Sequence, residues 1–96
     1  MMEKAYLSVN MKIDSSRLPE VTKVYTNYWE KFLRTIHGAR TKDLVIRNED
    51  VQILHSFNSV EDAVGFLSSE MFQRAVFIDL QPYWNDELNV RIYTAA

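Results

Sequence analysis

The chain has 96 residues and a mass of 11.3 kDa, which is enough for one domain. Eleven basic and thirteen acidic residues give a formal net charge of −2, and 47% of the residues are hydrophobic. This composition is typical of a globular protein and excludes an intrinsically disordered chain. Because the sequence contains no cysteine, disulfide bonds, zinc–thiolate sites and a cysteine nucleophile are also excluded.

Several common functional segments are absent from the sequence. No apolar run approaches the ~20 residues of a transmembrane helix, and there is no glycine-rich phosphate loop, GxSxG or HExxH motif. Residues 1–4 lead directly into a strand-like pattern without the apolar core of a signal peptide, so we expect a cytoplasmic protein without membrane contact. Two distant histidines are a poor basis for a metal site, and we expect neither a metal nor a cofactor.

The first half of the chain predicts a strand, a helix and a second strand. Residues 5–13 alternate, with Leu7, Val9 and Met11 on one side of a strand. Residues 17–37 carry apolar side chains at spacings of three and four, which predicts an amphipathic helix that ends at Gly38. Residues 43–47 form a short apolar run, and Asn48, Glu49 and Asp50 then predict a hairpin turn.

The second half predicts a strand, a helix and a final strand. Residues 51–57 form the other arm of the hairpin, and Ser59 has the position of a helix cap. The apolar spacing over residues 59–80 predicts a helix, with a kink near Gly65 and the Ser68–Ser69 pair, where Ser69 caps a second segment. Residues 87–94 alternate again. The order β-α-β-β-α-β predicts one ferredoxin-like α+β domain over residues 1–96, with a four-stranded antiparallel sheet and both helices on one face.

Helices on one face leave the other face of the sheet open to solvent, a ligand or another subunit. The first and last strands are neighbours in this topology, so their polar sides form one patch, made of Tyr6, Ser8, Asn10, Asn89, Arg91 and Tyr93. This mixture favours an interface with a pocket over a plain solvated surface. Counting back from Phe57 places His55 on the inner face, and a slip of one residue would bring it into the open patch.

Three segments resemble the dimeric α+β barrel superfamily, particularly small proteins of the antibiotic-biosynthesis-monooxygenase type: residues 57–63 (FNSVEDA), 68–72 (SSEMF) and 88–93 (LNVRIY). The resemblance spans nearly the whole chain. It implies a homodimer whose two sheets form a barrel, with a small-molecule ligand inside the barrel or between sheet and helices. It also implies an activity such as cofactor-independent oxygenation of a planar molecule, for which Asn10 matches a first-strand Asn and Trp29 or Trp84 could supply an indole. Residues 59–80 lack the His expected of haem-degrading members.

The residues themselves give the following candidates, each with a structural alternative. Asn10 could hydrogen-bond a substrate, or simply be a polar residue on the solvated side of its strand. His55 could act as an acid or base near neutral pH, or be a satisfied interior histidine. Arg91 could bind an anionic oxygen or form an ion pair. The candidate ligand-binding aromatic residues, which could equally serve packing, are Tyr6, Tyr93, Trp29 and Trp84.

Three functions therefore compete. The first is a homodimeric barrel that binds a small planar organic ligand and could act as a cofactor-independent monooxygenase. The second is a non-catalytic binding, interaction or regulatory module of the same fold, because no nucleophile–base pair is visible. The third, an RNA-recognition module, shares the order of elements. However, residues 51–58 lack its basic-Gly-aromatic pattern, and a net charge of −2 opposes nucleic acid.

Overall fold

The computed structural model describes residues 4–48 and 50–95, and its elements follow the predicted β-α-β-β-α-β order. The first half consists of strand β1 (Lys4–Ile13), a 3-10 turn η1 (Ser15–Arg17), helix α1 (Leu18–Thr35) and strand β2 (Ala39–Arg47). The second half consists of β3 (Asp50–Phe57), α2 (Val60–Leu67), α3 (Glu70–Arg74), a π-helical turn η2 (Ala75–Asp79) and β4 (Trp84–Ala95).

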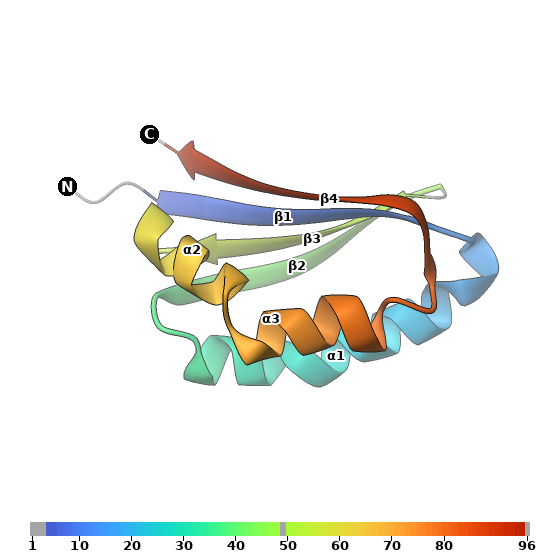
Figure 1. Ribbon diagram of the computed structural model, residues 1–96, viewed down its shortest axis with the longest axis horizontal. Helices are drawn as coiled ribbons and strands as arrows, with labels where there is room; N and C mark the ends of the chain where they lie inside the picture. The colour runs from blue at the N-terminus through green and yellow to red at the C-terminus, as the bar shows by residue number, and fades with distance from the viewer. Residues whose placement is uncertain (1–3, 49, 96) are drawn as a thin grey trace.

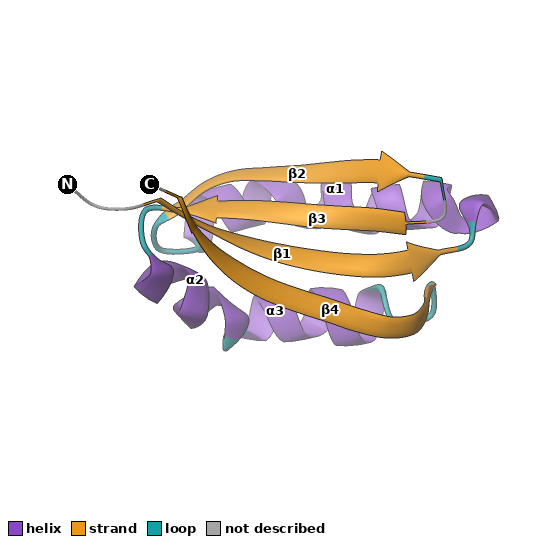
Figure 2. Ribbon diagram, turned by 90° about the horizontal axis from the view of Figure 1, so that it is seen from above, coloured by secondary structure: helices purple, strands orange, loops and turns teal. Residues whose placement is uncertain are grey.

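The four strands form one antiparallel sheet in the order β2-β3-β1-β4, so the first and last strands are neighbours as predicted. The helices all lie on one side of this sheet, below it in Figure 1. Figure 2 looks onto the opposite side, which we call the open face and which no described helix covers. The ferredoxin-like α+β architecture predicted from the sequence is therefore confirmed.

The core lies between the inner face of the sheet and the helices. Leu7, Val9 and Met11 of β1 are buried there, and Val90 and Ile92 of β4 pack against them, which confirms the predicted apolar side. Four phenylalanines fill the centre with ring centroids 5.0–5.7 Å apart: Phe32, Phe57, Phe66 and Phe72. Each buried side chain of this size contributes about 1.5–3 kcal/mol of hydrophobic stabilisation.

Helix α1 is shorter at both ends than the predicted range 17–37. It ends at Thr35, because Ile36 is already extended (ψ 122°) while its N–H still bonds the Phe32 carbonyl. Gly38 follows with φ 78°, a conformation that glycine adopts without strain, so the predicted role of Gly38 in stopping the helix is confirmed. His37 consequently lies beyond the last helical turn.

The second helical region is divided into segments at the predicted Ser68–Ser69 pair. Ser69 is the N-cap of α3, and its hydroxyl accepts a hydrogen bond from the Phe72 N–H at 3.2 Å. Ser59 caps α2 in the same way through the Asp62 N–H. Helix α2 continues through Gly65, so the kink comes from the serine pair.

Strands β2 and β3 meet at a shorter turn than predicted. Asp50 belongs to β3 and pairs with Arg47, and Asn48 has a positive φ of 43°. A turn over residues 48–50 would have paired residue 42 with residue 56, whereas the observed register pairs it with His55. Strand β2 also begins at Ala39, four residues earlier than predicted, and this brings Lys42 into the sheet.

Candidate functional site

The open face carries four of the predicted site residues on neighbouring strands. Tyr6 lies directly opposite Tyr93, and Arg91, two residues before Tyr93 in β4, lies opposite Ser8. Asn10 lies opposite Asn89, so the predicted patch is contiguous. Tyr93 keeps 46% of its surface exposed.

A hydrogen-bond network fixes the polar side chains near the middle of the open face. The Asn10 amide donates to the Ser8 hydroxyl at 2.8 Å, and the Gln52 amide donates to the same oxygen at 2.7 Å. Ser8 is completely buried beneath them. The Ser8 hydroxyl therefore links Asn10 of β1 to Gln52 of β3.

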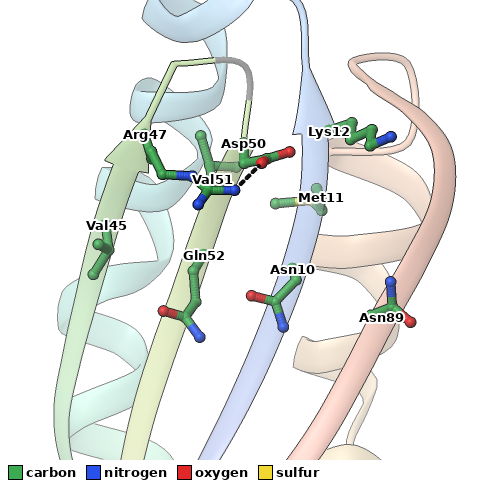
Figure 3. Close-up of a pocket in the computed structure, with 9 residues that line it drawn as sticks. All are labelled: Asn10, Met11, Lys12, Val45, Arg47, Asp50, Val51, Gln52 and Asn89. Carbon is green, nitrogen blue, oxygen red and sulfur yellow. Dashed lines mark hydrogen bonds and ion pairs between the residues drawn. The ribbon is translucent and has the colours of Figure 1, made fainter.

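A groove of about 540 Å³ lies on the open face toward the β2–β3 hairpin (Figure 3). In Figure 3, Val45, Gln52, Asn10 and Asn89 form a row across the four strands. An ion pair at 2.7 Å between Arg47 and Asp50 lies at the hairpin end of the groove. The groove is lined by amide side chains, the ion pair and the exposed Val45, and it has no enclosed apolar wall.

The inner face carries His55, as the count back from Phe57 predicted. His55 is 3% exposed, and its Nδ1 lies 3.0 Å from the Leu7 carbonyl oxygen, so Nδ1 carries the proton that donates to it. Phe32 and Phe66 flank the ring at 5.1 and 5.0 Å between centroids. This burial lowers the pKa of His55 to about 3, so its imidazole is neutral at pH 7 and Nε2 is a hydrogen-bond acceptor.

Lys42 lies beside His55 on the inner face, and sequence reasoning did not select it. It is 6% exposed and pairs with His55 across β2 and β3. The Lys42 ammonium lies over the rings of Tyr25, Tyr28 and Phe32 at 5.4, 5.7 and 5.6 Å from their centroids. Burial lowers the pKa of Lys42 to about 8. The sequence signal that could have identified Lys42 is its spacing, because Lys42, Leu44 and Ile46 lie two residues apart and therefore on the same side of a strand.

Two side chains of α1 hold this lysine in place through its backbone. The Tyr25 hydroxyl donates to the Lys42 carbonyl oxygen at 2.6 Å, and the Trp29 indole N–H donates to the same oxygen at 3.0 Å. Tyr25 and Trp29 are one helical turn apart, so they lie on one face of α1. Their two hydrogen bonds fix α1 against β2.

A small cavity of about 20 Å³ lies between the sheet and the helices, and we call it the inner cavity. This volume corresponds to about one water molecule. Its walls combine two polar residues with aromatic and aliphatic ones, and they include Lys42, His55, Tyr25, Tyr28, Phe66 and Met71. The Tyr28 hydroxyl donates to the Asp79 carboxylate, which joins α1 to η2 at this cavity, and burial together with Asp79 raises the pKa of Tyr28.

Neither tryptophan is a wall of the inner cavity. Trp29 contacts the Lys42 carbonyl oxygen and keeps 44% of its surface exposed. Trp84 begins β4, and its indole N–H donates to the Val76 carbonyl oxygen at 3.1 Å. The N–H groups of both indoles are thus engaged by backbone carbonyls, and neither tryptophan lies with the open-face patch.

The structure therefore separates the predicted site residues into groups. Tyr6, Asn10, Arg91 and Tyr93 lie together on the open face, while His55 lies on the inner face. Because the sheet stands between them, Asn10 and His55 of one protomer cannot contact the same small molecule. His55 and Lys42 are the polar residues that the fold brings together within an apolar enclosure.

The described residues contain no group of three or more His, Asp or Glu side chains that could hold a metal ion. Within the same ranges, no helix is long and apolar enough to cross a membrane.

Several solved structures share this architecture at low sequence identity. "Putative antibiotic biosynthesis monooxygenase from Nitrosomonas europaea" superposes with a TM-score of 0.81 at 9% identity, over 99% of this chain and 92% of that one. A protein of the same designation from Caulobacter crescentus gives a TM-score of 0.82 at 13% identity, with the same two coverages. A conserved protein from Methanosarcina mazei gives 0.81 at 14% identity, over 96% and 92%.

The sequence itself matches no protein-family model and no curated protein. At 9–14% identity, the structural likeness establishes the fold and not the chemistry. Nearly complete coverage of both chains means that the likeness includes the sheet and the helices alike. The chain thus has the ferredoxin-like α+β fold of the antibiotic-biosynthesis-monooxygenase type.

Proposed function

We propose that two copies of this chain pair through their open faces into a homodimeric α+β barrel, and that each protomer binds a small planar organic molecule at the inner cavity. We further propose that the bound molecule is oxidised by molecular oxygen without a cofactor. The single observation that carries this proposal is the placement of Lys42 and His55 side by side in an apolar enclosure. Buried polar groups cost stability, so such a pair marks a candidate functional site.

The dimer is supported by the chemistry of the open face. Val45 and Tyr93 are 47% and 46% exposed there, next to the amide network and Arg91. A stable interface removes about 800 Å² from each partner, roughly an eighth of the 6066 Å² surface of this chain. One uncovered sheet face can supply an area of that order, and aromatic residues together with Arg are typical of such interfaces.

The oxidation is supported by what the inner cavity would do to a bound ring. The phenylalanine cluster excludes water, and the neutral His55 offers Nε2 as a hydrogen-bond acceptor that orients an O–H group of the ligand. Without a cofactor, the substrate must supply all four electrons that reduce O₂. An activated ring methylene satisfies this balance, because CH₂ and O₂ give a ketone and one water molecule.

The ligand must widen the inner cavity, because about 20 Å³ holds a single small group. Met71 is a wall residue that can move aside, since its side chain is unbranched and flexible. The small volume is also the observation that favours the alternative, a non-catalytic ligand-binding or interaction module. Both functions involve ligand binding, so a measurement of turnover is needed to distinguish the oxidising enzyme from the non-catalytic module.

The first experiment is sizing of the purified chain at low micromolar concentration, where we expect twice the 11.3 kDa monomer mass. A monomer at that concentration would contradict the proposed barrel.

The second experiment supplies a planar anthrone and ¹⁸O₂ and measures oxygen uptake above the protein-free rate. We expect one ¹⁸O atom in the product, and a loss of at least tenfold in rate for His55→Asn. The Asn amide can still donate to the Leu7 carbonyl oxygen, but it lacks the Nε2 acceptor. Binding of the anthrone without uptake would favour the non-catalytic module.

A further inference from the structure

Lys42 is a buried cation that has no anionic partner among the described residues. Its neighbours are the faces of Tyr25, Tyr28 and Phe32, and no carboxylate contributes to the environment that lowers its pKa. Aromatic faces attract an ammonium group but do not neutralise it. A charge that is removed from water in this way remains costly until an opposite charge joins it.

The elements around Lys42 supply hydrogen-bonding groups, and the two carboxylates near them, Asp43 and Asp79, act on the tyrosines rather than on the ammonium. Strand β3 supplies the neutral His55, and α1 supplies the hydroxyls of Tyr25 and Tyr28. Tyr25 is engaged with the Lys42 carbonyl oxygen. Asp79 of η2 accepts a hydrogen bond from the Tyr28 hydroxyl, and Arg74 of α3 also acts on Tyr28. The exposed Asp43 acts on Tyr25, and neither carboxylate is among the causes of the lowered pKa of Lys42.

The lysine is also held so that its amine remains at the cavity. The hydrogen bonds from Tyr25 and Trp29 to its carbonyl oxygen anchor the backbone, and the β2–β3 register directs the side chain inward. The cavity at this point has the volume of about one small group. A single oxygen atom of a ligand fits that space, and its remaining atoms would displace Met71.

We propose that the inner cavity binds the anionic oxygen of a small organic ligand, such as a carboxylate, phenolate or enolate, and that Lys42 is the residue that pairs with it. This inference rests on the ligand-binding function proposed above and names the chemical class of the ligand. In the oxidation proposed there, the same ion pair stabilises the oxyanion that forms when the substrate loses a proton.

The test compares two probes of equal shape, benzoate and the neutral benzamide, by NMR titration of the full chain at pH 7. We expect benzoate to bind at least tenfold more tightly than benzamide. The Lys42→Met variant should lose this preference, while Lys31→Met, which removes a solvent-exposed lysine of α1, should keep it. Benzoate affinity should fall as the pH rises from 7 to 9.5, because the free amine no longer attracts the carboxylate.

Equal affinities for the two probes would overturn the oxyanion site, as would the absence of benzoate binding. Wild-type benzoate affinity in a folded Lys42→Met protein would overturn the role of Lys42. These results are separable from failure of the proposed function. Equal binding of both probes leaves a planar-ligand protein intact, whereas a monomer without oxygen uptake removes that function even if benzoate is preferred.

Discussion

Replacing Lys42 with methionine should make the protein more stable at pH 7, although the substitution removes the group on which ligand binding is proposed to depend. Methionine has a similar length and an unbranched shape, so it can occupy the space of the lysine stem among Tyr25, Tyr28 and Phe32. It needs no hydration. The substitution therefore removes a buried charge without opening a cavity.

The magnitude follows from the pKa of Lys42, which burial lowers from 10.5 to about 8. This depression corresponds to a cost of about 3 kcal/mol for carrying the charge in the folded state at pH 7. Loss of the attraction between the one ammonium group and the three rings, together worth about 1–2 kcal/mol, offsets part of the gain. We expect a net stabilisation of about 1–2 kcal/mol, which is a rise in melting temperature of roughly 4–16 °C for a domain of this size.

The pH dependence of this difference is the sharper test. Between pH 8 and 10.5 the unfolded lysine still binds a proton that the folded protein has released, so wild-type stability rises with pH. From pH 7 to pH 10 the rise attributable to Lys42 is about 2.5 kcal/mol, and Lys42→Met should lack it. The advantage of the variant should therefore shrink and reverse on going to pH 10.

Urea unfolding followed by circular dichroism at pH 7 and pH 10, at one fixed protein concentration, measures both quantities. Lys31→Met is the matched control and should change stability by less than about 0.5 kcal/mol at either pH. A Lys42→Met protein that is destabilised at pH 7, with the same pH dependence as the wild type, would refute the reasoning.

Three further predictions concern other parts of the molecule. Because burial lowers the pKa of His55 to about 3, wild-type stability should fall by about 1.4 kcal/mol per pH unit as the pH drops from 6.5 toward 3, and His55→Asn should show a shallower acid unfolding curve in urea. The open-face variants Asn10→Ala and Arg91→Ala should keep the wild-type circular dichroism spectrum but dissociate at higher concentration in sedimentation. If these two variants weaken ligand binding while the dimer is unchanged, the ligand lies inside the barrel and not in the inner cavity. Ser69→Ala removes the cap of α3 and should cost about 1 kcal/mol in thermal unfolding; an unchanged melting temperature would show that the cap contributes nothing.

Much of the fold could be predicted because its signals are local. Alternation over residues 5–13 identified the buried side of β1, and Ser59 and Ser69 identified the starts of two helical segments. The inward direction of His55 followed from counting along β3 from Phe57, because side chains alternate strictly along a strand.

The candidate site was predicted less completely. Asn10, Arg91 and the two open-face tyrosines were correctly grouped as one patch, and whether they bind a ligand or a partner sheet stays a prediction. Lys42 was not selected, since a lysine next to an apolar run is ordinarily assigned to solvent. The predicted strand over residues 43–47 began just after it.

The sequence alone determined the order of the elements, the apolar side of each central strand and the capping of the helices, because these depend on neighbours along the chain. The tertiary structure decided what lies beneath the helices. The short hairpin turn pairs Lys42 with His55, and the hydrogen bonds from Tyr25 and Trp29 hold that stretch of β2 against α1. Local periodicity cannot give this register, because it depends on a single residue of turn length. It also cannot give the contacts with α1, because Trp29 and Tyr25 lie 13 and 17 residues from Lys42 in the sequence.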